Sequence, residues 1–485
     1  MKMPSIFAFF SVALAAGCAS PDAVSAEPPA ETAFIFKADN GEQTPAFRGE
    51  FQVPENRSDP DSRTLTLRYV RFAATGENPG SPIVYLAGGP GGSGIRTAKW
   101  RRFPLFMAMR EFGDVVAFEQ RGTGESDDTP ECVSDIFIPD DEALPVEEAY
   151  TRLHRSVVQC RTFWEAQGVD LRGYTTVESA RDLDALRAHL GVEKITLWGI
   201  SYGTHLALAS VKEMEERIDR LVLASAEGLD QTVKLPSRTD AYFDRVQEAI
   251  DAQPAAKAAY PDIKALMRRV HAKLEKEPVM LQLETGAGAS ANYLLQKQKM
   301  QRIASGMISD PSRAVTLLQI YSAVDAGDYA PAVGILQRFV RPGAPVEWSA
   351  MSLAMDVASG IGEDRLAQVE REAQTALLGD FLNFPMPQLN GALADMDLGD
   401  DFRTAPQSDI PALLLTGTLD GRTYPESQQE AVAGLRNVTT VTVKNAGHNL
   451  FMSSPEVTEA IQRFMRGEAI EDRMISIDPP EFVPN

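Results

Sequence analysis

The stretch Ile195-Thr196-Leu197-Trp198-Gly199-Ile200-Ser201-Tyr202-Gly203 decides the fold of this 485-residue chain. Its first four residues form a short, mostly apolar run that suits a buried strand, and residues 204–214 have the spacing of a helix. Gly-x-Ser-x-Gly is common by chance, but it is specific when a strand precedes it and a helix follows. Glycines relieve crowding in such a turn, which lifts the serine hydroxyl clear of the sheet. We therefore predict that Ser201 is a nucleophile. The alternative is a serine in an ordinary strand-to-helix turn.

Other short apolar runs predict the rest of the sheet. Runs of this length and composition suit strands that are covered on both faces, as in a parallel sheet. They occupy residues 83–86, 115–118, 221–224, 412–415 and 438–443. Residues 51–53 and the alternating run 64–70 predict an antiparallel pair, and residues 177–190 have helical spacing. The alternation of strands and helices predicts an α/β fold whose sheet is mostly parallel.

The pattern changes after Gly228, where apolar residues take helical spacing and no convincing strand follows until residue 407. Candidate helices in this block occupy residues 241–252, 263–275, 293–307, 314–324 and 365–378. We expect a sheet domain formed by residues 33–227 and 407–470. A helical cap, residues 228–406, is inserted into it, and residues 471–485 form a C-terminal tail.

The N-terminus has the pattern of an export signal. Lys2 precedes an apolar stretch, residues 6–16, that is too short to span a bilayer. Residues 15–18 resemble a lipobox, which predicts a signal peptide of residues 1–18 and a lipid on Cys18. The alternative is ordinary cleavage after Ala26. Residues 19–32 are expected to be a flexible tether. The protein is thus expected to be exported, either attached to a membrane through that lipid or free in the periplasm or outside.

Charge and cysteine content restrict the function further. The net charge of −21 argues against a nucleic-acid partner, because a phosphate backbone would be repelled. Histidines and cysteines are few and lack ligand spacing, so no metal site is expected. Besides Cys18 there are two cysteines, Cys132 and Cys160. An oxidising compartment would let them pair, and the alternative is two separate buried thiols.

A serine nucleophile needs a base and an acid. His448 follows the strand run 438–443, and a loop at the carboxyl end of a strand is the expected place for the base. Asp420 follows the run 412–415 and comes before His448 in the chain, as the order Ser, Asp, His requires. Glu227 is the second candidate for the acid. Of the other histidines, His205 should point away from the serine in its helix, and exposed helix faces are expected for three more: His154, His189 and His271.

The tetrahedral intermediate also needs hydrogen-bond donors for its oxyanion. The N–H of Tyr202 and that of Gly89, in the glycine-rich segment 87–94 after a strand, are the candidates. The same segment satisfies Gly-x-Gly-x-x-Gly, a dinucleotide fingerprint. Pro90 is awkward for that turn, and a serine, an acid and a histidine in order have no place in a dinucleotide site. No cofactor is therefore expected.

Together these motifs resemble the serine peptidase family of prolyl aminopeptidases and secreted tripeptidyl aminopeptidases. Residues 88–94 are similar to its His-Gly-Gly-Pro-Gly loop, residues 119–126 to its Asp-Gln-Arg-Gly-x-Gly-x-Ser motif, and residues 174–204 to its segment around the nucleophile. The resemblance implies an α/β-hydrolase fold with an inserted helical cap and a Ser-His-Asp triad. It also implies removal of N-terminal residues from short peptides, and a disulfide between Cys132 and Cys160.

The chain departs from the family at several positions. Ala87 replaces the histidine of the oxyanion loop, Glu119 replaces an aspartate, and Gly421 stands where a proline is common. The family binds the substrate amine with acidic residues of the cap, and several carboxylates here are candidates, although each could equally be a solvated surface group: Glu227, Asp356, Glu363 and Asp364. A carboxylesterase on the same machinery and a non-catalytic binding protein with this fold are the rival functions.

Overall fold

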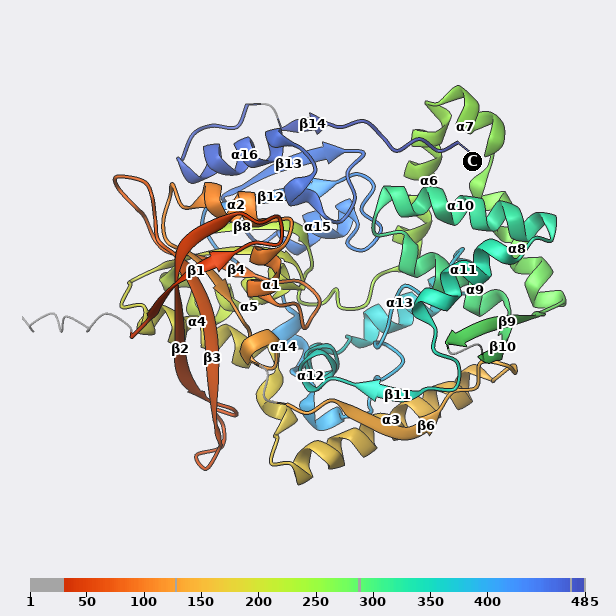
Figure 1. Cartoon of the computed structure of the whole chain (residues 1–485), viewed down its shortest axis with the longest axis horizontal. Coiled ribbons are helices and arrows are strands. Elements are labelled where there is room, and N and C mark those ends of the chain that lie inside the picture. Colours follow the sequence, from red (N-terminus) through yellow and green to blue (C-terminus); the bar gives the residue numbers. More distant parts are fainter. Residues whose placement is uncertain (1–29, 127–128, 287–288, 472, 484–485) are drawn as a thin grey trace, which may run out of the picture.

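A computed structural model describes residues 30–126, 129–286, 289–471 and 473–483, and its centre is a ten-stranded sheet (Figure 1). In spatial order the strands are β1 (Thr32–Lys37), β2 (Gln43–Pro54), β3 (Thr64–Phe72), β5 (Val115–Phe118), β4 (Ile83–Leu86), β7 (Ile195–Ser201), β8 (Ile218–Ala226), β12 (Ala412–Gly417), β13 (Val438–Lys444) and β14 (Met474–Ser476). The first three pairings, from β1 to β5, are antiparallel, and the rest are parallel.

The central strands are buried on both faces, as their continuous apolar sequences predicted. Every residue of β4 and β5 is buried. Successive side chains of a strand point to opposite faces, so Ile83 packs into one hydrophobic cluster and Val84 into another. The expected strands 83–86 and 115–118 are confirmed, and the α/β class with them.

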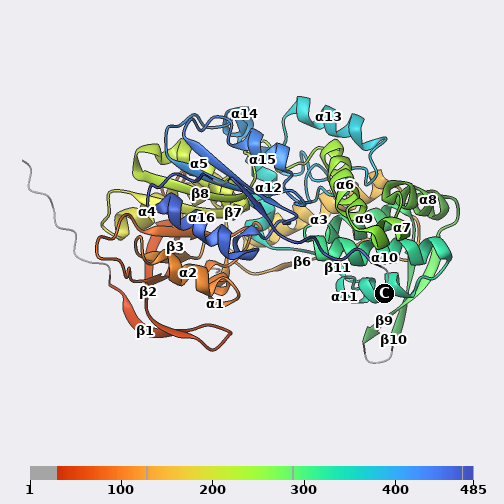
Figure 2. The same ribbon diagram turned by 90° about the horizontal axis from the view of Figure 1, so that it is seen from above.

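Helices cover both faces of the sheet (Figure 2). On one face, α1 (Gly94–Lys99), α2 (Phe103–Met109) and α16 (Pro455–Met465) contribute apolar side chains to the cluster that contains Ile83. On the other face, α4 (Thr176–His189), α5 (Tyr202–Met214) and α15 (Pro425–Ala431) pack into the cluster that contains Val84. Three layers result, with the carboxyl ends of the parallel strands at one edge.

Most of the block between β8 and β12 has its own hydrophobic core, and its helices lie beside the sheet domain in Figure 1. The helices of the block are α6 (Pro236–Asp251), α7 (Pro254–Ala259), α8 (Ile263–Lys276), α9 (Lys297–Met307), α10 (Pro311–Ala326), α11 (Ala330–Phe339), α12 (Ala350–Ser359), α13 (Glu363–Ala373) and α14 (Gly399–Arg403). The helix α12 differs from α6–α11, because its apolar residues pack into the core of the sheet domain. The boundaries 228 and 406 stay a prediction.

The block also contains strands, so the expectation of an all-helical segment is wrong. Strands β9 (Val279–Gly286) and β10 (Ala289–Leu295) form an antiparallel hairpin. Their alternate residues, such as Leu281 and Leu283, enter the core of the block. The strand β10 occupies the start of the expected helix 293–307, so the helix α9 begins only at Lys297. A further strand, β11 (Pro345–Trp348), pairs with β6 (Cys132–Phe137).

The C-terminal segment connects the two parts of the molecule. It first adds β14 to the edge of the sheet beside β13. It then runs to the helical block, where Phe482 is fully buried in the core of that block. The side chain of Gln253 donates to the carbonyl of Pro480 at 3.0 Å and accepts the N–H of Phe482 at 3.1 Å. The expected tail is therefore a packed element up to Phe482.

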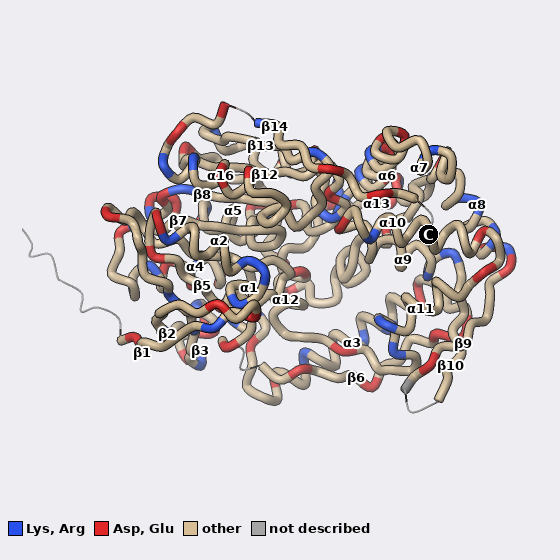
Figure 3. The backbone as a smooth tube through the Cα atoms, turned by 45° about the horizontal axis from the view of Figure 1, so that its top comes forward, with Lys and Arg blue, Asp and Glu red and all other residues tan. Residues whose placement is uncertain are grey.

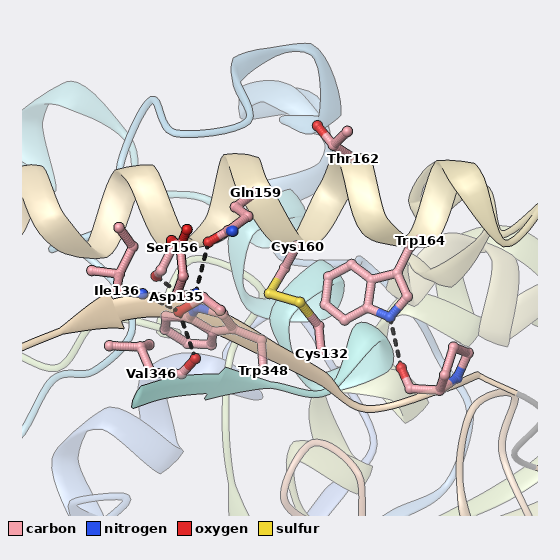
Figure 4. The surroundings of a disulfide bond; sticks show 12 residues. Cys132, Asp135, Ile136, Ser156, Gln159, Cys160, Thr162, Trp164, Val346 and Trp348 are labelled. Carbon is pink, nitrogen blue, oxygen red and sulfur yellow. Dashed lines mark hydrogen bonds between the residues drawn. A yellow bond between two sulfur atoms is a disulfide. The ribbon is translucent and has the colours of Figure 1, made fainter. Parts of the chain in front are cut away.

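A disulfide joins Cys132 at the start of β6 to Cys160 on α3 (Val146–Ala166), as the family resemblance implied (Figure 4). Both residues are buried. Next to it, the indole N–H of Trp348 on β11 donates to the Ser156 hydroxyl of α3 at 2.9 Å. The bridge and this bond fix α3 against β6 and β11. The alternative of two separate thiols is thereby excluded.

The proposed leader, Cys18 and residues 19–29 of the expected tether lie outside the described residues. The expected end of the tether at residue 32 is wrong, because Glu31 forms an ion pair with Arg71 and β1 begins at Thr32. Among the helices that the structure describes, none has both the length and the apolar character that crossing a bilayer requires.

We predict that replacing both cysteines, Cys132→Ala with Cys160→Ala, lowers the free energy of unfolding by about 3 kcal/mol. The bridge spans a sequence separation of 28 residues, and closing a loop of that size restricts the unfolded chain by about that amount. Urea denaturation of the oxidised protein and of the variant measures the change. Chemical reduction of the unmodified protein is the control and should give a similar shift. An unchanged midpoint would contradict a stabilising role.

Candidate active site

Ser201 lies in a strained turn between β7 and α5. Its backbone has φ 55° and ψ −130°, a conformation that residues other than glycine rarely adopt. The glycines on either side are required by space. A Cβ on Gly203 would lie 2.1 Å from the carbonyl oxygen of Leu86, and one on Gly199 would lie 2.6 Å from that of Gly203. The turn can therefore form only with this spacing of glycines.

Asp420 and His448 are brought together from the loops after β12 and β13. The His448 Nδ1 lies 3.0 Å and 3.1 Å from the two carboxylate oxygens. Asp420 is fully buried and accepts the N–H groups of Arg422 at 2.8 Å and Thr423 at 3.0 Å. Burial alone raises the pKa of this carboxyl, but the charge and hydrogen bond of His448 and these two N–H groups outweigh burial and lower it. The carboxylate therefore stays ionised at neutral pH, and protonation would remove this stabilisation only in acid.

The loop that carries His448 is fixed from two sides. The N–H of His448 donates to the carbonyl of Ser309, which precedes α10, at 2.9 Å. The carbonyl of His448 accepts the hydroxyl of Ser225 at the end of β8, at 2.8 Å. Ser225 itself has a positive φ of 52°. The histidine is thus positioned by both the helical block and the sheet.

Ser201 and His448 line one pocket of about 240 Å³. The pocket is also lined by Tyr85, Ala87, Gly88, Gly89, Gly92, Thr97, Trp100, Arg101, Arg102, Ile200 and Asn449. Among the hydrogen bonds of the described residues, none joins the Ser201 hydroxyl to the imidazole. Such bonds are often long in a site without substrate and tighten when substrate binds.

The glycine-rich loop after β4 lies directly against the serine. A Cβ on Gly88 would be 3.1 Å from the Cβ of Ser201, and the N–H of Gly92 closes the loop onto the Gly88 carbonyl at 3.0 Å. Tyr202 is the first residue of α5, where backbone N–H groups have no partner within the helix. Gly89 and Tyr202 thus flank the serine, and their role as oxyanion donors stays a prediction.

The helix α12 supports the glycine-rich loop and Tyr202. The sequence did not indicate this supporting role. The Ser352 hydroxyl donates to the carbonyl of Pro90 in the glycine-rich loop at 3.1 Å. One turn on, the sulfur of Met355 accepts the hydroxyl of Tyr202 at 2.9 Å. These residues are polar or flexible and occur in an ordinary helical pattern, so only the tertiary contacts mark them.

The other histidines lie outside this pocket. His205 is buried and points away from Ser201, as expected, with Nδ1 3.1 Å from the Gly228 carbonyl. The expected exposure is wrong for His271, which is buried. Its Nε2 lies 2.7 Å from the Tyr321 hydroxyl. Burial lowers its pKa to about 4. The helix α8 turns this face toward the core of the helical block. His154 and His189 are half-buried.

The four candidate amine-binding acids separate into two groups. Glu363 and Asp364 are exposed in the first turn of α13. Glu227 is buried, forms an ion pair with Lys234 at 3.0 Å, and is linked to the nucleophile turn because its N–H donates to the Thr204 hydroxyl at 2.8 Å. It contacts Lys234 rather than His448, so the acid beside the histidine is Asp420.

Asp356 on α12 is the most perturbed of these four carboxyls. Burial, and then the nearby Glu227 carboxylate, raises its pKa to about 7, while the positive charges of Lys234 and Arg422 oppose the rise. Within the described residues its carboxylate has no hydrogen bond or ion pair. Its neighbour Met355 contacts Tyr202. Asp356 and Glu227 lie close enough to interact with each other and with the Tyr202 hydroxyl, so they form an acidic pair near the residue that follows the nucleophile.

The motif at residues 119–126 has a structural role. Glu119 is buried and accepts the Ser93 hydroxyl at 2.5 Å and the Ile95 N–H at 3.0 Å, which holds the start of α1. Burial raises its pKa to about 7. Arg121 is also buried, and its Nε donates to the Asp182 carboxylate of α4 at 2.6 Å. Among the described residues no cluster of three or more possible metal ligands occurs.

The sequence matches the family described as "alpha/beta hydrolase fold" over residues 81–455. The three-layered fold, with a serine turn and an acid–histidine pair at one edge of the sheet, agrees with that class. The chain belongs to the α/β-hydrolase fold family.

Two similar proteins, among others, are peptidases by name. The chain is 35% identical over 190 residues to serine protease Hip1 of Mycobacterium tuberculosis. This match covers 37% of this chain and 36% of that protein. It is 31% identical over 187 residues to tripeptidyl aminopeptidase of Streptomyces lividans, covering 36% and 34%. The matches thus span about a third of these relatives. A solved proline iminopeptidase-related protein from Thermus thermophilus aligns with 86% of this chain and 97% of its own, at 17% identity and a TM-score of 0.38; the family assignment does not depend on it.

We predict that Gly203→Ala lowers the free energy of unfolding by about 1–3 kcal/mol, because the added methyl group overlaps a backbone carbonyl of β4 that cannot move. Thermal or urea denaturation measures the loss. Gly306→Ala is the matched control. Gly306 lies in α9 with open space around its Cβ position, so this change should stabilise by about 0.5–1 kcal/mol. Equal effects of the two substitutions would contradict the packing argument.

Proposed function

We propose that this protein is a serine hydrolase that forms an acyl-enzyme at Ser201, and that it acts as an aminopeptidase on short peptides. The strained turn supports the first part, because it holds a serine hydroxyl in the same pocket as His448. The unpartnered carboxylate of Asp356 carries the second part, because a substrate ammonium group would supply the partner it lacks.

The proposed reaction proceeds by two acyl transfers. Ser201 attacks the scissile carbonyl while His448 accepts its proton, and the buried carboxylate of Asp420 stabilises the imidazolium that forms. The N–H groups of Gly89 and Tyr202 receive the developing oxyanion. His448 then donates the proton to the leaving amine, which departs. Water, activated by the same imidazole, attacks the ester and releases the acyl product with free Ser201.

The peptidase assignment is further supported by the names of the relatives, serine protease and tripeptidyl aminopeptidase. Asp356 and Glu227 lie beside Tyr202 and are the acids that would hold a free N-terminus. Glu363 and Asp364 are exposed, and we do not assign them this role. We expect the helical block to limit access to the site, which would favour short peptides over folded proteins. No cofactor takes part in the proposed reaction.

We further propose that the protein is exported. A lipobox ending at Cys18 would attach it to a membrane by a lipid, whereas cleavage after Ala26 would leave it free. The disulfide between Cys132 and Cys160 supports an oxidising compartment.

A panel of matched substrates tests the proposed function. We expect hydrolysis of prolyl or tripeptidyl anilides with a free amine, since both types of release are open. The value of kcat/KM should be lower by about tenfold or more when the amine is acylated, because the ammonium contact is lost. Ser201→Ala should lower kcat by at least about 10⁴-fold.

Each alternative has its own outcome in this panel. Equal turnover of free and blocked anilides would contradict an aminopeptidase, and turnover of simple esters alone would indicate an esterase. Activity that survives Ser201→Ala would show that the nucleophile is another residue. Failure of Ser201 to react with a fluorophosphonate probe would indicate a non-catalytic protein.

The raised pKa of Asp356 predicts how substrate binding depends on pH. Its carboxyl is neutral below about pH 7 and charged above it, so KM for a free-amine substrate should rise as the pH falls through 7. Asp356→Asn should raise KM about tenfold at pH 7.5 and abolish this dependence, since the amide carries no charge. Steady-state kinetics between pH 5.5 and 7.5 measure both effects, with KM corrected for the part of the substrate amine that loses its proton near the upper limit.

Glu363→Gln is the matched control for Asp356→Asn, because Glu363 is an exposed acid at the start of the next helix. It should leave KM and its pH dependence unchanged. The same pH dependence of KM in Asp356→Asn as in the unmodified protein would exclude Asp356 as the amine-binding acid.

A further inference from the structure

Two arginines, Arg101 and Arg102, line the pocket that contains Ser201 and His448. They lie in the short connection between α1 and α2, where Figure 3 shows a blue stretch beside the α1 label. The Arg102 guanidinium donates to the side-chain oxygen of Asn449 at 3.1 Å and to the Tyr85 hydroxyl. The Arg101 guanidinium lies 4.3 Å from the ring centroid of Trp100. Neither arginine was indicated by a sequence motif.

The partners of both arginines are neutral. Within the part of the chain that the structure describes, neither guanidinium forms an ion pair, although the protein has 68 acidic and 47 basic residues. Buried Arg121, by contrast, has the carboxylate of Asp182. A guanidinium has five N–H donors in a planar fork that matches a carboxylate. Two adjacent cations without a carboxylate, in a protein of net charge −21, therefore leave a site for an anion in this pocket.

The position of the arginines assigns the anion to one side of the scissile bond. In acyl transfer the histidine donates its proton to the leaving group, so the leaving group must lie next to His448. Asn449 directly follows His448 and contacts Arg102. The acidic pair Asp356 and Glu227, proposed to hold the substrate amine, does not line this pocket. This placement favours the leaving-group side over the acyl side for the two arginines.

We infer that Arg101 and Arg102 bind a carboxylate on the leaving-group side of the substrate. This inference rests on the proposed aminopeptidase function. In a short peptide the nearest such group is the free C-terminal carboxylate, one or two residues beyond the scissile bond. An aspartate side chain directly after that bond offers the same chemistry. The site is therefore specific for peptides with a carboxylate at or near the C-terminal end. The preference is strongest when the scissile bond comes directly before the residue that carries this carboxylate.

Three peptides test the inference on the whole protein. They share the same free N-terminal tripeptide and differ in the fourth residue, which is alanine with a free carboxylate, alanine amide, or aspartate amide. We expect kcat/KM for the free acid to exceed that for alanine amide by about tenfold or more at low ionic strength, because a guanidinium–carboxylate pair is a strong charged contact. Added salt should reduce this ratio. The aspartate amide shows whether a side-chain carboxylate serves equally.

Charge removal then identifies the residues. The ratio of acid to amide should fall toward 1 in Arg101→Gln with Arg102→Gln, and Arg102→Lys should retain part of it. Arg338→Gln, an exposed arginine on α11, is the matched control and should leave the ratio unchanged. Because Arg102 contacts Asn449, its loss could also disturb His448. Such a structural effect lowers both rates together and leaves their ratio as it was.

The outcomes separate this inference from the function on which it rests. Equal cleavage of acid and amide by the unmodified protein, a preference for the amide, or a ratio that survives the double substitution overturns the inference and leaves the aminopeptidase proposal intact. If none of the three peptides is cleaved although free-amine anilides are, this inference alone fails; if neither is cleaved, both proposals fail.

Discussion

The turn at Ser201 is the constraint on which the rest of the site depends. Its positive φ costs about 1–3 kcal/mol and persists only because the surrounding structure enforces it. That enforcement comes from the centre of the sheet, where β7 lies between β4 and β8. The backbone at Gly203 passes so close to the Leu86 carbonyl that no Cβ fits. The same closeness places the glycine-rich loop after β4 beside the serine, so the nucleophile and its candidate oxyanion donors are positioned by one packing contact.

The helix α12 connects the helical block to this turn. Ser352, Met355 and Ser359 are spaced three and four residues apart and share one face of the helix. They contact the Pro90 carbonyl, the Tyr202 hydroxyl and the ring of His205. Asp356 is on the same helix, so one element carries both the proposed amine-binding acid and the support of the glycine-rich loop. The segment that follows β14 also joins the sheet to the helical block, because Phe482 is buried in the core of that block.

Sequence periodicity predicted the sheet well, because its central strands are buried on both faces and therefore continuously apolar. It failed in the helical block, where β9 and β10 bury one face only: the pattern indicated no strand there, and the predicted helix 293–307 included the end of β10. It also failed for His271. The charged neighbours of that residue suggested an exposed face, yet α8 turns it toward Tyr321 in the core. In both cases the deciding partner lies on another segment.

The sequence by itself determined the strand–turn–helix around Ser201, the glycines that the turn requires, and the order of Ser201, Asp420 and His448, because these depend on neighbours in the chain. Only the tertiary structure decided which acid meets His448, and that Asp356 and Glu227 lie together while Glu363 and Asp364 face solvent. It alone placed Arg101 and Arg102 in the pocket of the serine. The physical reason is that burial and charge interactions depend on distances in space. These distances are set by the packing of segments that lie far apart in the sequence.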